Sequence, residues 1–174
     1  MLNINNLGHR TNVLYNSFFG EITEKSEYWV IQTAARPNFF WGNYILMKKA
    51  PIQGCYEEWV QIFEEEIGTR SKLGFMAIAY DDISSVNNKN SEFEQAGCKV
   101  LINKILTASS VHPTEKVNKE LVVKAYSEES YWEAYKHIHH DPDWGYGTHE
   151  AQSMFLDEEI NDFKKIIAMG KGQR

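Results

Sequence analysis

The sequence has few cysteines, no excess of basic residues and no long apolar run. Its 174 residues contain only Cys55 and Cys98, which are too few for a disulfide framework and do not form a closely spaced metal-binding pair. A reducing compartment is therefore the simpler expectation. The formal net charge of −6 argues against non-specific binding to nucleic acid or anionic membranes, because both need a basic surface. A local site for an anionic small molecule stays open.

Membrane insertion and secretion are also not expected. No apolar run approaches the roughly 20 residues that span a bilayer. The first residues, Met1–Asn6, carry neither the basic region nor the apolar region of a secretory signal. We therefore predict a cytoplasmic protein. The length suits one sizeable domain, or one domain plus a fragment, and 43% hydrophobic residues are ordinary for a globular chain.

What the chain does have is an aromatic segment, Arg36–Tyr44, in which four of nine residues are aromatic. It lies between two predicted strands, Tyr28–Thr33 and Asn43–Met47, which we expect to pair. Pro37 fixes its own φ and removes a backbone donor, so the segment is predicted to be a connection. Its side chains either pack at the edge of a core or wall a pocket.

Helices and strands alternate in the next part of the chain. Tyr56–Ile67 has apolar residues at helical spacing and glutamates on the other face, and predicts a helix. The apolar run Gly74–Tyr80 predicts a central strand, covered on both faces and paired in parallel. A short helix Ser91–Ala96 that stops at Gly97 and a long strand Lys99–Thr107 follow. This alternation indicates an α/β domain.

The last third of the chain is predicted to start with a polar connection at 109–120, which is the best candidate boundary. A strand Leu121–Tyr126 follows, then a helix capped by Ser127 that runs to about His139, and a last helix capped by Thr148. The buried positions expected on these helices are Tyr131, Trp132, Tyr135 and Ile138 or His139 on the first, and Leu156, Ile160, Phe163 and Ile167 on the second. The early segment Leu7–Phe19 is mixed and is not assigned.

Several of these residues together resemble a known family. The pattern is Trp29-Val30-x-x-Thr33, then Arg36-Pro37-Asn38-x-Phe40-Trp41-Gly42-Asn43-Tyr44, then Trp59 and Phe63 on the helix. It resembles a group within the GNAT acetyltransferase superfamily in which two GNAT units follow one another, and the match covers about residues 28–107. The resemblance implies a mixed β-sheet flanked by helices in residues 1–108, then the linker 109–120. Residues 121–174 resemble the start of a second unit, which is either truncated or completes the first.

The resemblance also implies a function. GNAT proteins transfer an acyl group from coenzyme A to an amine, so the parent protein is expected to acetylate a small-molecule or peptide amine from acetyl-CoA. This chain is then the accessory half that helps to form the acceptor pocket, with Trp41, Asn43 and Tyr44 as pocket candidates. The alternative is a non-catalytic ligand-binding or dimerisation module, for example a homodimer, that keeps the fold and has lost the cofactor.

The loop before the first long helix bears on that choice. The family holds the cofactor pyrophosphate on backbone N–H groups at a helix N-terminus, where the helix dipole favours an anion. The matching stretch here is Lys49–Glu58, in which Lys49, Gln53 and Gly54 are the weak candidates for cofactor binding. It has one glycine, Pro51 removes a donor, and Glu57 and Glu58 add negative charge. These features disfavour acetyl-CoA binding by this chain.

Other chemistry is only weakly indicated. A general base could come from Tyr44, Tyr80, Asp81 or Asp82 at strand ends, but packed tyrosines and loop-capping aspartates are the preferred interpretation, so none is assigned. Cys55 at a helix N-terminus could be a nucleophile, but the neighbouring glutamates oppose a thiolate and a packed thiol is preferred. The histidine-rich segment 137–143, with His149 nearby, matches no familiar metal motif, so no metal is predicted.

Overall fold

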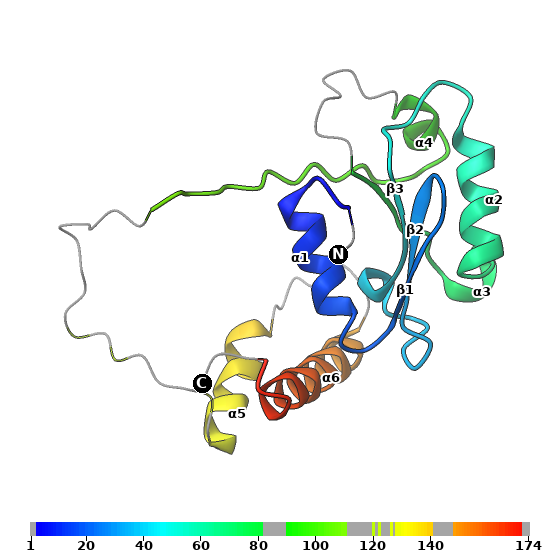
Figure 1. Ribbon diagram of the computed structural model, residues 1–174. Coiled ribbons are helices and arrows are strands. Elements are labelled where there is room, and N and C mark those ends of the chain that lie inside the picture. The colour runs from blue at the N-terminus through cyan, green and yellow to red at the C-terminus, as the bar shows by residue number, and fades with distance from the viewer. Residues whose placement is uncertain are drawn as a thin grey trace. The chain divides into compact units, whose positions relative to one another are not determined.

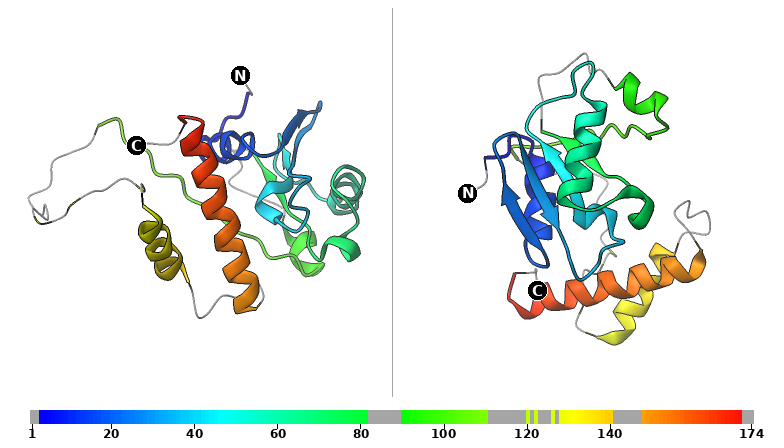
Figure 2. Two further views of the ribbon diagram at one scale, coloured as in Figure 1. Left: turned by 90° about the horizontal axis from the view of Figure 1, so that it is seen from below. Right: turned by 90° about the vertical axis from the view of Figure 1, so that its right-hand side faces the viewer.

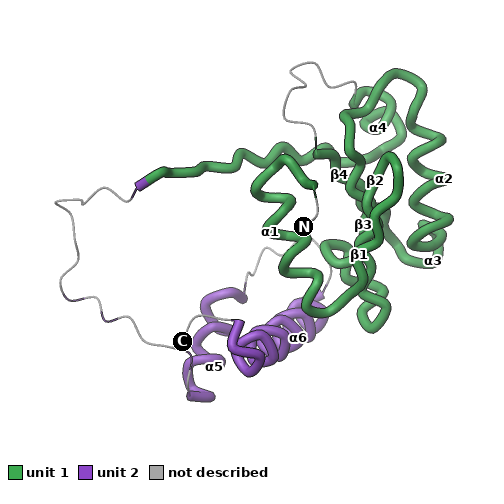
Figure 3. The backbone as a smooth tube through the Cα atoms, in the orientation of Figure 1, with its two compact units in different colours: residues 1–109 green, residues 110–174 purple. Residues whose placement is uncertain are grey.

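The computed structural model describes residues 3–81, 90–110, 128–140 and 148–171, with residues 120, 122 and 126 as single positions. The chain divides into two compact units, Met1–Ser109 and Ser110–Arg174 (Figure 3). The division falls at the start of the polar connection that the sequence indicates. No helix among the described residues is long and apolar enough to cross a membrane.

The first unit is built on a mixed four-stranded sheet with the order β1-β2-β3-β4 (Figure 1). Strands β1 (Glu21–Glu24), β2 (Tyr28–Gln32) and β3 (Asn43–Met47) form an antiparallel meander. Strand β4 (Ile78–Tyr80) then joins β3 in parallel. The predicted α/β fold, the pairing of the strands that flank the aromatic segment, and the parallel pairing are therefore confirmed.

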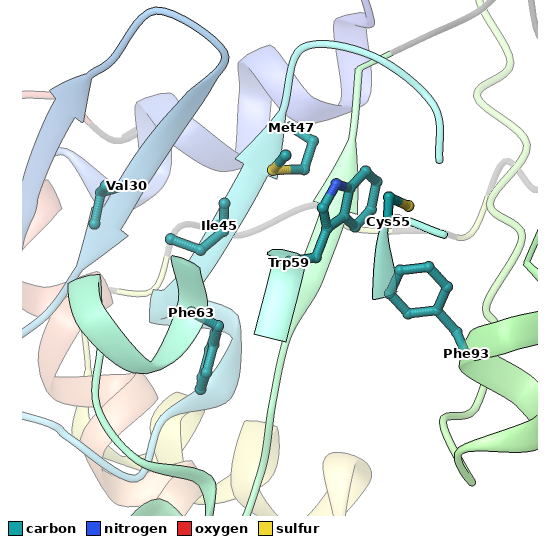
Figure 4. Packing of buried hydrophobic residues seen from close by; sticks show 7 residues of the cluster. All are labelled: Val30, Ile45, Met47, Cys55, Trp59, Phe63 and Phe93. Carbon is teal, nitrogen blue, oxygen red and sulfur yellow. The ribbon is translucent and has the colours of Figure 1, made fainter. Parts of the chain in front are cut away.

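Both faces of this sheet are covered, because successive apolar side chains of β2 and β3 point to opposite faces of the sheet. Helix α1 (Leu7–Asn16) lies on one face and α2 (Tyr56–Glu66) on the other (Figures 1 and 2). The α1 face buries the cluster Ile4, Val13, Trp29, Ile31, Tyr44 and Leu46. The α2 face buries Val30, Ile45, Met47, Cys55, Trp59, Phe63 and Phe93 (Figure 4). The sheet is thus the middle layer of the unit.

Helix α2 follows the predicted spacing closely. Trp59 and Phe63 are 7% and 0% exposed, and both face the sheet. The short helix α4 (Ser91–Gln95) is also confirmed, and it ends before Gly97, whose φ of +84° is a left-handed conformation that favours glycine. Phe93 of α4 packs on the Trp59 ring with centroids 5.3 Å apart. A further short helix, α3 (Arg70–Leu73), precedes β4.

Two predictions for this unit are wrong, and two elements were not predicted. The expected strand Lys99–Thr107 has no regular secondary structure, because composition alone cannot make a strand, and no strand among the described residues accepts its hydrogen bonds. Strand β4 is short and last in the sheet order rather than central, although its residues pack on both faces, with Ile78 and Tyr80 against the α2-side cluster and Ala79 against the α1-side cluster. Helix α1 lies in the segment that was not assigned, and β1 was not predicted. Most of the expected loop 86–90 lies outside the described residues.

The second unit contains two helices, α5 (Glu129–His139) and α6 (His149–Ala168). Their side chains pair in antiparallel order, with Lys164 on Glu129 at 2.8 Å and Lys136 on Asp157 at 2.7 Å. Thr148 caps α6 as predicted, since its hydroxyl accepts from the Ala151 N–H.

Burial in the second unit follows the predicted stripes only in part. Trp132, Leu156 and Ile160 are buried as expected, but Ile138 is 75% exposed, and Ile166 rather than Ile167 is the more buried residue near the end of α6. Single aliphatic side chains are often exposed on protein surfaces, so the exposure of Ile138 needs no special cause. Most of the expected strand Leu121–Tyr126 and the cap Ser127 lie outside the described residues.

Candidate functional site

The connection between β3 and α2 is the place where an anion would bind in a fold of this kind. It follows the carboxyl end of a strand and leads into a helix N-terminus, whose first N–H groups have no partner within the helix. Gly54 has a φ of +85°, and a Cβ atom there would meet nothing within 4 Å. This glycine is therefore required by its backbone conformation and leaves the approach to the helix open.

A carboxylate of the chain itself lies at this position. The Gly54 N–H donates to Glu92 Oε1 across 2.6 Å, and Glu92 comes from α4. Cys55 is the N-cap residue of α2 and makes no side-chain hydrogen bond to the helix. Glu57 and Glu58 occupy the first turn, where the helix dipole favours negative charge. The α2 N-terminus thus already holds the kind of group that it attracts.

The lysines of this loop point to another part of the sheet. Lys48 Nζ contacts Glu24 Oε1 at 2.8 Å and the Lys25 carbonyl oxygen at 2.7 Å, and it lies 4.7 Å from the Trp29 ring centroid. Lys49 Nζ is 3.5 Å from Glu27 Oε2. Both ammonium groups therefore neutralise the glutamates around the β1–β2 turn instead of the α2 N-terminus. Of the three cofactor candidates, Gly54 donates its N–H at this helix end, Lys49 is paired with Glu27, and Gln53 is exposed.

Cys55 belongs to the core. Its side chain is 5% exposed and packs in the cluster under α2 (Figure 4). Burial raises the pKa of the Cys55 thiol; a hydrogen bond to the Ile52 backbone offsets part of this effect, and the nearby charges of Glu92 and Glu58 raise the pKa by smaller amounts. A nucleophilic cysteine needs the opposite shift. The preferred interpretation of Cys55 as a packed thiol fits this environment.

The aromatic segment is closed by Asn43, the second of the three pocket candidates. Its Oδ1 accepts from the Thr33 N–H at 2.9 Å, and its Nδ2 donates to the carbonyls of Arg36 and Phe39, both at 2.8 Å. Asparagine suits this position because one amide supplies both an acceptor and two donors. At 2% exposure, Asn43 ties the loop to the strand end and is not available to a ligand.

The other two pocket candidates differ from each other. Tyr44 is 5% exposed on the α1 face, and burial raises the pKa of its phenol, which the Asn16 side chain offsets only in part. Its hydroxyl has no partner at hydrogen-bond geometry among the described residues. Trp41 is 47% exposed and packs against Phe40 at 4.8 Å between ring centroids. Only Trp41 therefore presents its ring to solvent.

Asp81, one of the candidate general bases at the strand ends, is a buried carboxylate that directly follows β4. It is 1% exposed and accepts from the N–H groups of Asn5 and Asn6 at 2.6 and 2.7 Å. These residues lead into α1, which Asn6 caps. With both oxygens held by backbone donors, Asp81 fastens the start of α1 to the sheet. Asp82, the other aspartate considered, lies outside the described residues.

His9 completes this cluster and was not identified from the sequence. Its Nε2 lies 3.1 Å from the Tyr80 carbonyl oxygen, which can only accept, so Nε2 carries the proton. Burial lowers the pKa of His9 below 6.5, while Asp81 and the Tyr80 hydrogen bond offset part of this effect. The Asn6-Leu7-Gly8-His9 sequence, an N-cap residue before a helix, is the signal that could have revealed the cluster.

The histidine-rich segment does not assemble a metal site among the described residues. No group of three or more His, Cys, Asp or Glu side chains there could hold a metal ion. His139 packs on Tyr135 at 4.1 Å and His140 stacks on His149 at 5.3 Å between ring centroids. Asp141 and Asp143 lie outside the described residues.

Neither protein-family models, nor curated proteins, nor solved structures show a match to this chain in a comparison. The resemblance to the GNAT superfamily therefore stays a prediction that rests on the residues quoted above. What the structure adds is the order of the elements and the environment of each candidate residue.

Proposed function

We propose that this chain is an accessory unit of a GNAT-type protein that does not hold acetyl-CoA at its own α2 loop. The protein that contains it would transfer an acetyl group from acetyl-CoA to a small-molecule or peptide amine. The mixed sheet, with a helix between the parallel strands β3 and β4, supports the fold part of this proposal. The aromatic segment would then serve the unit as a closed structural connection.

One observation carries the non-catalytic part of the proposal. The Glu92 carboxylate accepts from the Gly54 N–H at the helix end where a pyrophosphate would need that donor. A pyrophosphate at this end would have to displace Glu92 and lie beside Glu57 and Glu58. Lys48 and Lys49 do not compensate, because both are paired with other carboxylates. Like charges at such short range oppose binding.

Thermal unfolding with and without acetyl-CoA tests this directly. A ligand that binds only the folded state raises the midpoint, so we expect no shift for the wild-type chain in excess acetyl-CoA. Isothermal titration calorimetry with acetyl-CoA should show no heat of binding. A clear shift together with binding heat would contradict the accessory role.

A matched pair of variants tests whether Glu92 is the reason. Glu92→Gln removes the charge at the α2 N-terminus, and Glu94→Gln removes a charge from the same short helix without touching Gly54. Both substitutions are made in a background that already carries Glu57→Gln and Glu58→Gln. We expect the triple variant with Glu92→Gln to bind coenzyme A weakly, and the triple variant with Glu94→Gln to show no binding. Equal binding by both would show that Glu92 does not block the site.

The second candidate function is a dimerisation module with no role for acetyl-CoA. It is favoured by the exposed aliphatic residues of segment 99–107, which a catalytic or accessory role leaves unexplained. Loss of amine acetylation by the complete protein on deletion of this unit would favour the accessory role. Unchanged acetylation with loss of self-association would favour the module.

A further inference from the structure

Segment 99–107, which follows α4, shows neither hydrogen bonds to other described residues nor burial of its large side chains. No hydrogen bond joins residues 99–109 to any other part of the chain that the structure describes. Its large side chains are also exposed: Leu101 is 50% exposed, Ile102 81% and Leu106 93%. Aliphatic side chains gathered in one short stretch mark an interaction surface more often than a free one.

The residues of this segment suit a β-strand. Lys99-Val100-Leu101-Ile102-Asn103-Lys104-Ile105-Leu106-Thr107 is rich in β-branched and aliphatic residues and has no proline or glycine. The segment contacts the start of α1, where a Cβ atom on Gly8 would lie 2.4 Å from Ile105 Cδ1. Ile105 is still 44% exposed. The stretch therefore has the composition of a strand but pairs with no second strand in the part of the chain that the structure describes.

A second copy of the same segment is the partner that the sequence fits. With Asn103 opposite its own copy in an antiparallel pair, Val100 lies opposite Leu106, and Leu101 opposite Ile105. Directly opposite residues share a face, so both apolar pairs form twice, once on each side of the axis. The segment is close to a palindrome in hydrophobic pattern around Asn103.

Charge selects the same register. Lys99 and Lys104 are the only charged residues in the segment, and this register places them opposite Thr107 and Ile102. A two-fold axis through Lys104 would set two ammonium groups directly opposite each other, which is unfavourable. An axis through Ile102 would set Val100 opposite Lys104 and Leu101 opposite Asn103. Within the segment, the register through Asn103 pairs four aliphatic residues with one another, whereas the register through Lys104 pairs only Ile102 with Leu106 and the register through Ile102 sets only Ile102 opposite its own copy.

We propose that residues 99–107 of two copies pair as antiparallel strands around a two-fold axis at Asn103, so that the protein forms a homodimer. Backbone hydrogen bonds across the pair give the segment the partners that it lacks among the described residues of one chain. The aliphatic pairs withdraw Leu101 and Leu106 from water, and the aliphatic stem of Lys104 lies beside Ile102. The interface is independent of acetyl-CoA binding and of the role proposed for the α2 loop.

Sedimentation equilibrium of the full chain tests the association, and one position tests the register. Ile102→Lys sets a lysine opposite Lys104 of the other copy, whereas Ile102→Glu sets a carboxylate there. Because each pair occurs twice, we expect Ile102→Lys to weaken dimerisation by about tenfold or more relative to Ile102→Glu. Ile138→Lys, at an equally exposed isoleucine in α5, is the control and should leave the dimer unchanged.

Hydrogen exchange of the wild-type chain gives a second readout that needs no variant. The amides of residues 99–107 should exchange freely in dilute solution and become protected as the concentration rises. A chain that stays monomeric up to about 1 mM would overturn the proposal, because even weak association is visible there. Protection that does not depend on concentration would show an internal partner and would also overturn it. A dimer that tolerates Ile102→Lys as well as Ile102→Glu would reject this interface.

Discussion

At the N-termini of helices α1 and α2, backbone N–H groups donate to a carboxylate, but one of these contacts is buried and the other lies at the surface. Each receives a carboxylate from a distant part of the chain onto backbone N–H groups, Asp81 for α1 and Glu92 for α2. The hydrogen bonds are similar in length, at 2.6 to 2.7 Å. The surroundings differ: Asp81 is 1% exposed, whereas the contact between Gly54 and Glu92 is at the surface.

The difference in burial makes the Asp81 contact at α1 a fixed structural junction and the Glu92 contact at α2 one that can be displaced. At α1 the Asn6 side chain adds a cap on the Gly8 and His9 N–H groups, so both carboxylate and cap are used. At α2 the cap residue Cys55 makes no side-chain hydrogen bond. A buried, fully satisfied junction has no room for a ligand. If this unit ever accepts an anion, the open α2 end is the place.

The largest effect is expected from Asp81→Ala. Removal of the carboxylate leaves the Asn5 and Asn6 N–H groups without their acceptor next to a buried sheet end, so we expect a loss of about 3 to 5 kcal/mol in the free energy of unfolding. Urea denaturation, followed by tryptophan fluorescence, measures this change in the free energy of unfolding. Asp81→Asn keeps one acceptor oxygen and should lose roughly half as much. A loss below that of a surface substitution would mean that Asp81 does not fasten α1.

A smaller effect is expected from Asn6→Ala. The substitution removes the cap of α1 but leaves Asp81 on the backbone, and we expect a loss of about 1 kcal/mol. The same denaturation experiment applies. Asn6→Ser, which keeps a capping oxygen, is the matched control and should recover most of that loss. If serine fails to do so, the side chain acts through something other than the cap.

The α1 junction should also depend on pH through His9. Its pKa is lower in the folded chain than its ordinary value of 6.5, so between the two values the unfolded chain binds more protons. Stability should therefore rise with pH in the range just below 6.5 and level off above it. Chemical denaturation on both sides of pH 6.5 measures this, and His9→Gln should flatten that part of the profile. An unchanged profile in the variant would assign the dependence to other groups.

The smallest effect is expected at the other junction. Glu92→Gln removes an exposed charge from the α2 N-terminus and should change stability by under about 0.5 kcal/mol, an effect that salt screens. The loss caused by Asp81→Ala should persist in high salt, because buried groups are screened much less. Denaturation of both variants at low and high ionic strength compares the two junctions directly. Equal salt sensitivity would remove the distinction between them.

Predictions from the sequence succeeded where a local pattern is strong. The spacing of Trp59 and Phe63 identifies α2, and the hydrophobic runs around the aromatic segment identify β2 and β3. They failed at α1, which is only weakly amphipathic and depends on Asp81, and at β1, whose residues are mostly exposed and show no alternation. Segment 99–107 has the composition of a strand, but none of the described residues forms a strand beside it.

The candidate site divides in the same way. The deficiencies of the α2 loop, a single glycine with Pro51, Glu57 and Glu58, are visible in the sequence alone. That Asn43 is a closed structural link, that Tyr44 is buried and that Trp41 is exposed could not be predicted from their order in the chain. The family pattern marks these three residues equally, because a motif records residue type and not the direction of a side chain.

The sequence by itself determined the α/β class, the main helices and strands, and the acidic, proline-containing character of loop Lys49–Glu58, because each depends on residues close together in the chain. Only the tertiary structure decided which carboxylate serves which helix. Glu92 and Gly54 are 38 positions apart, and Asp81 and Asn5 are 76 apart. Such contacts form when packing brings distant segments together, and no local pattern records them.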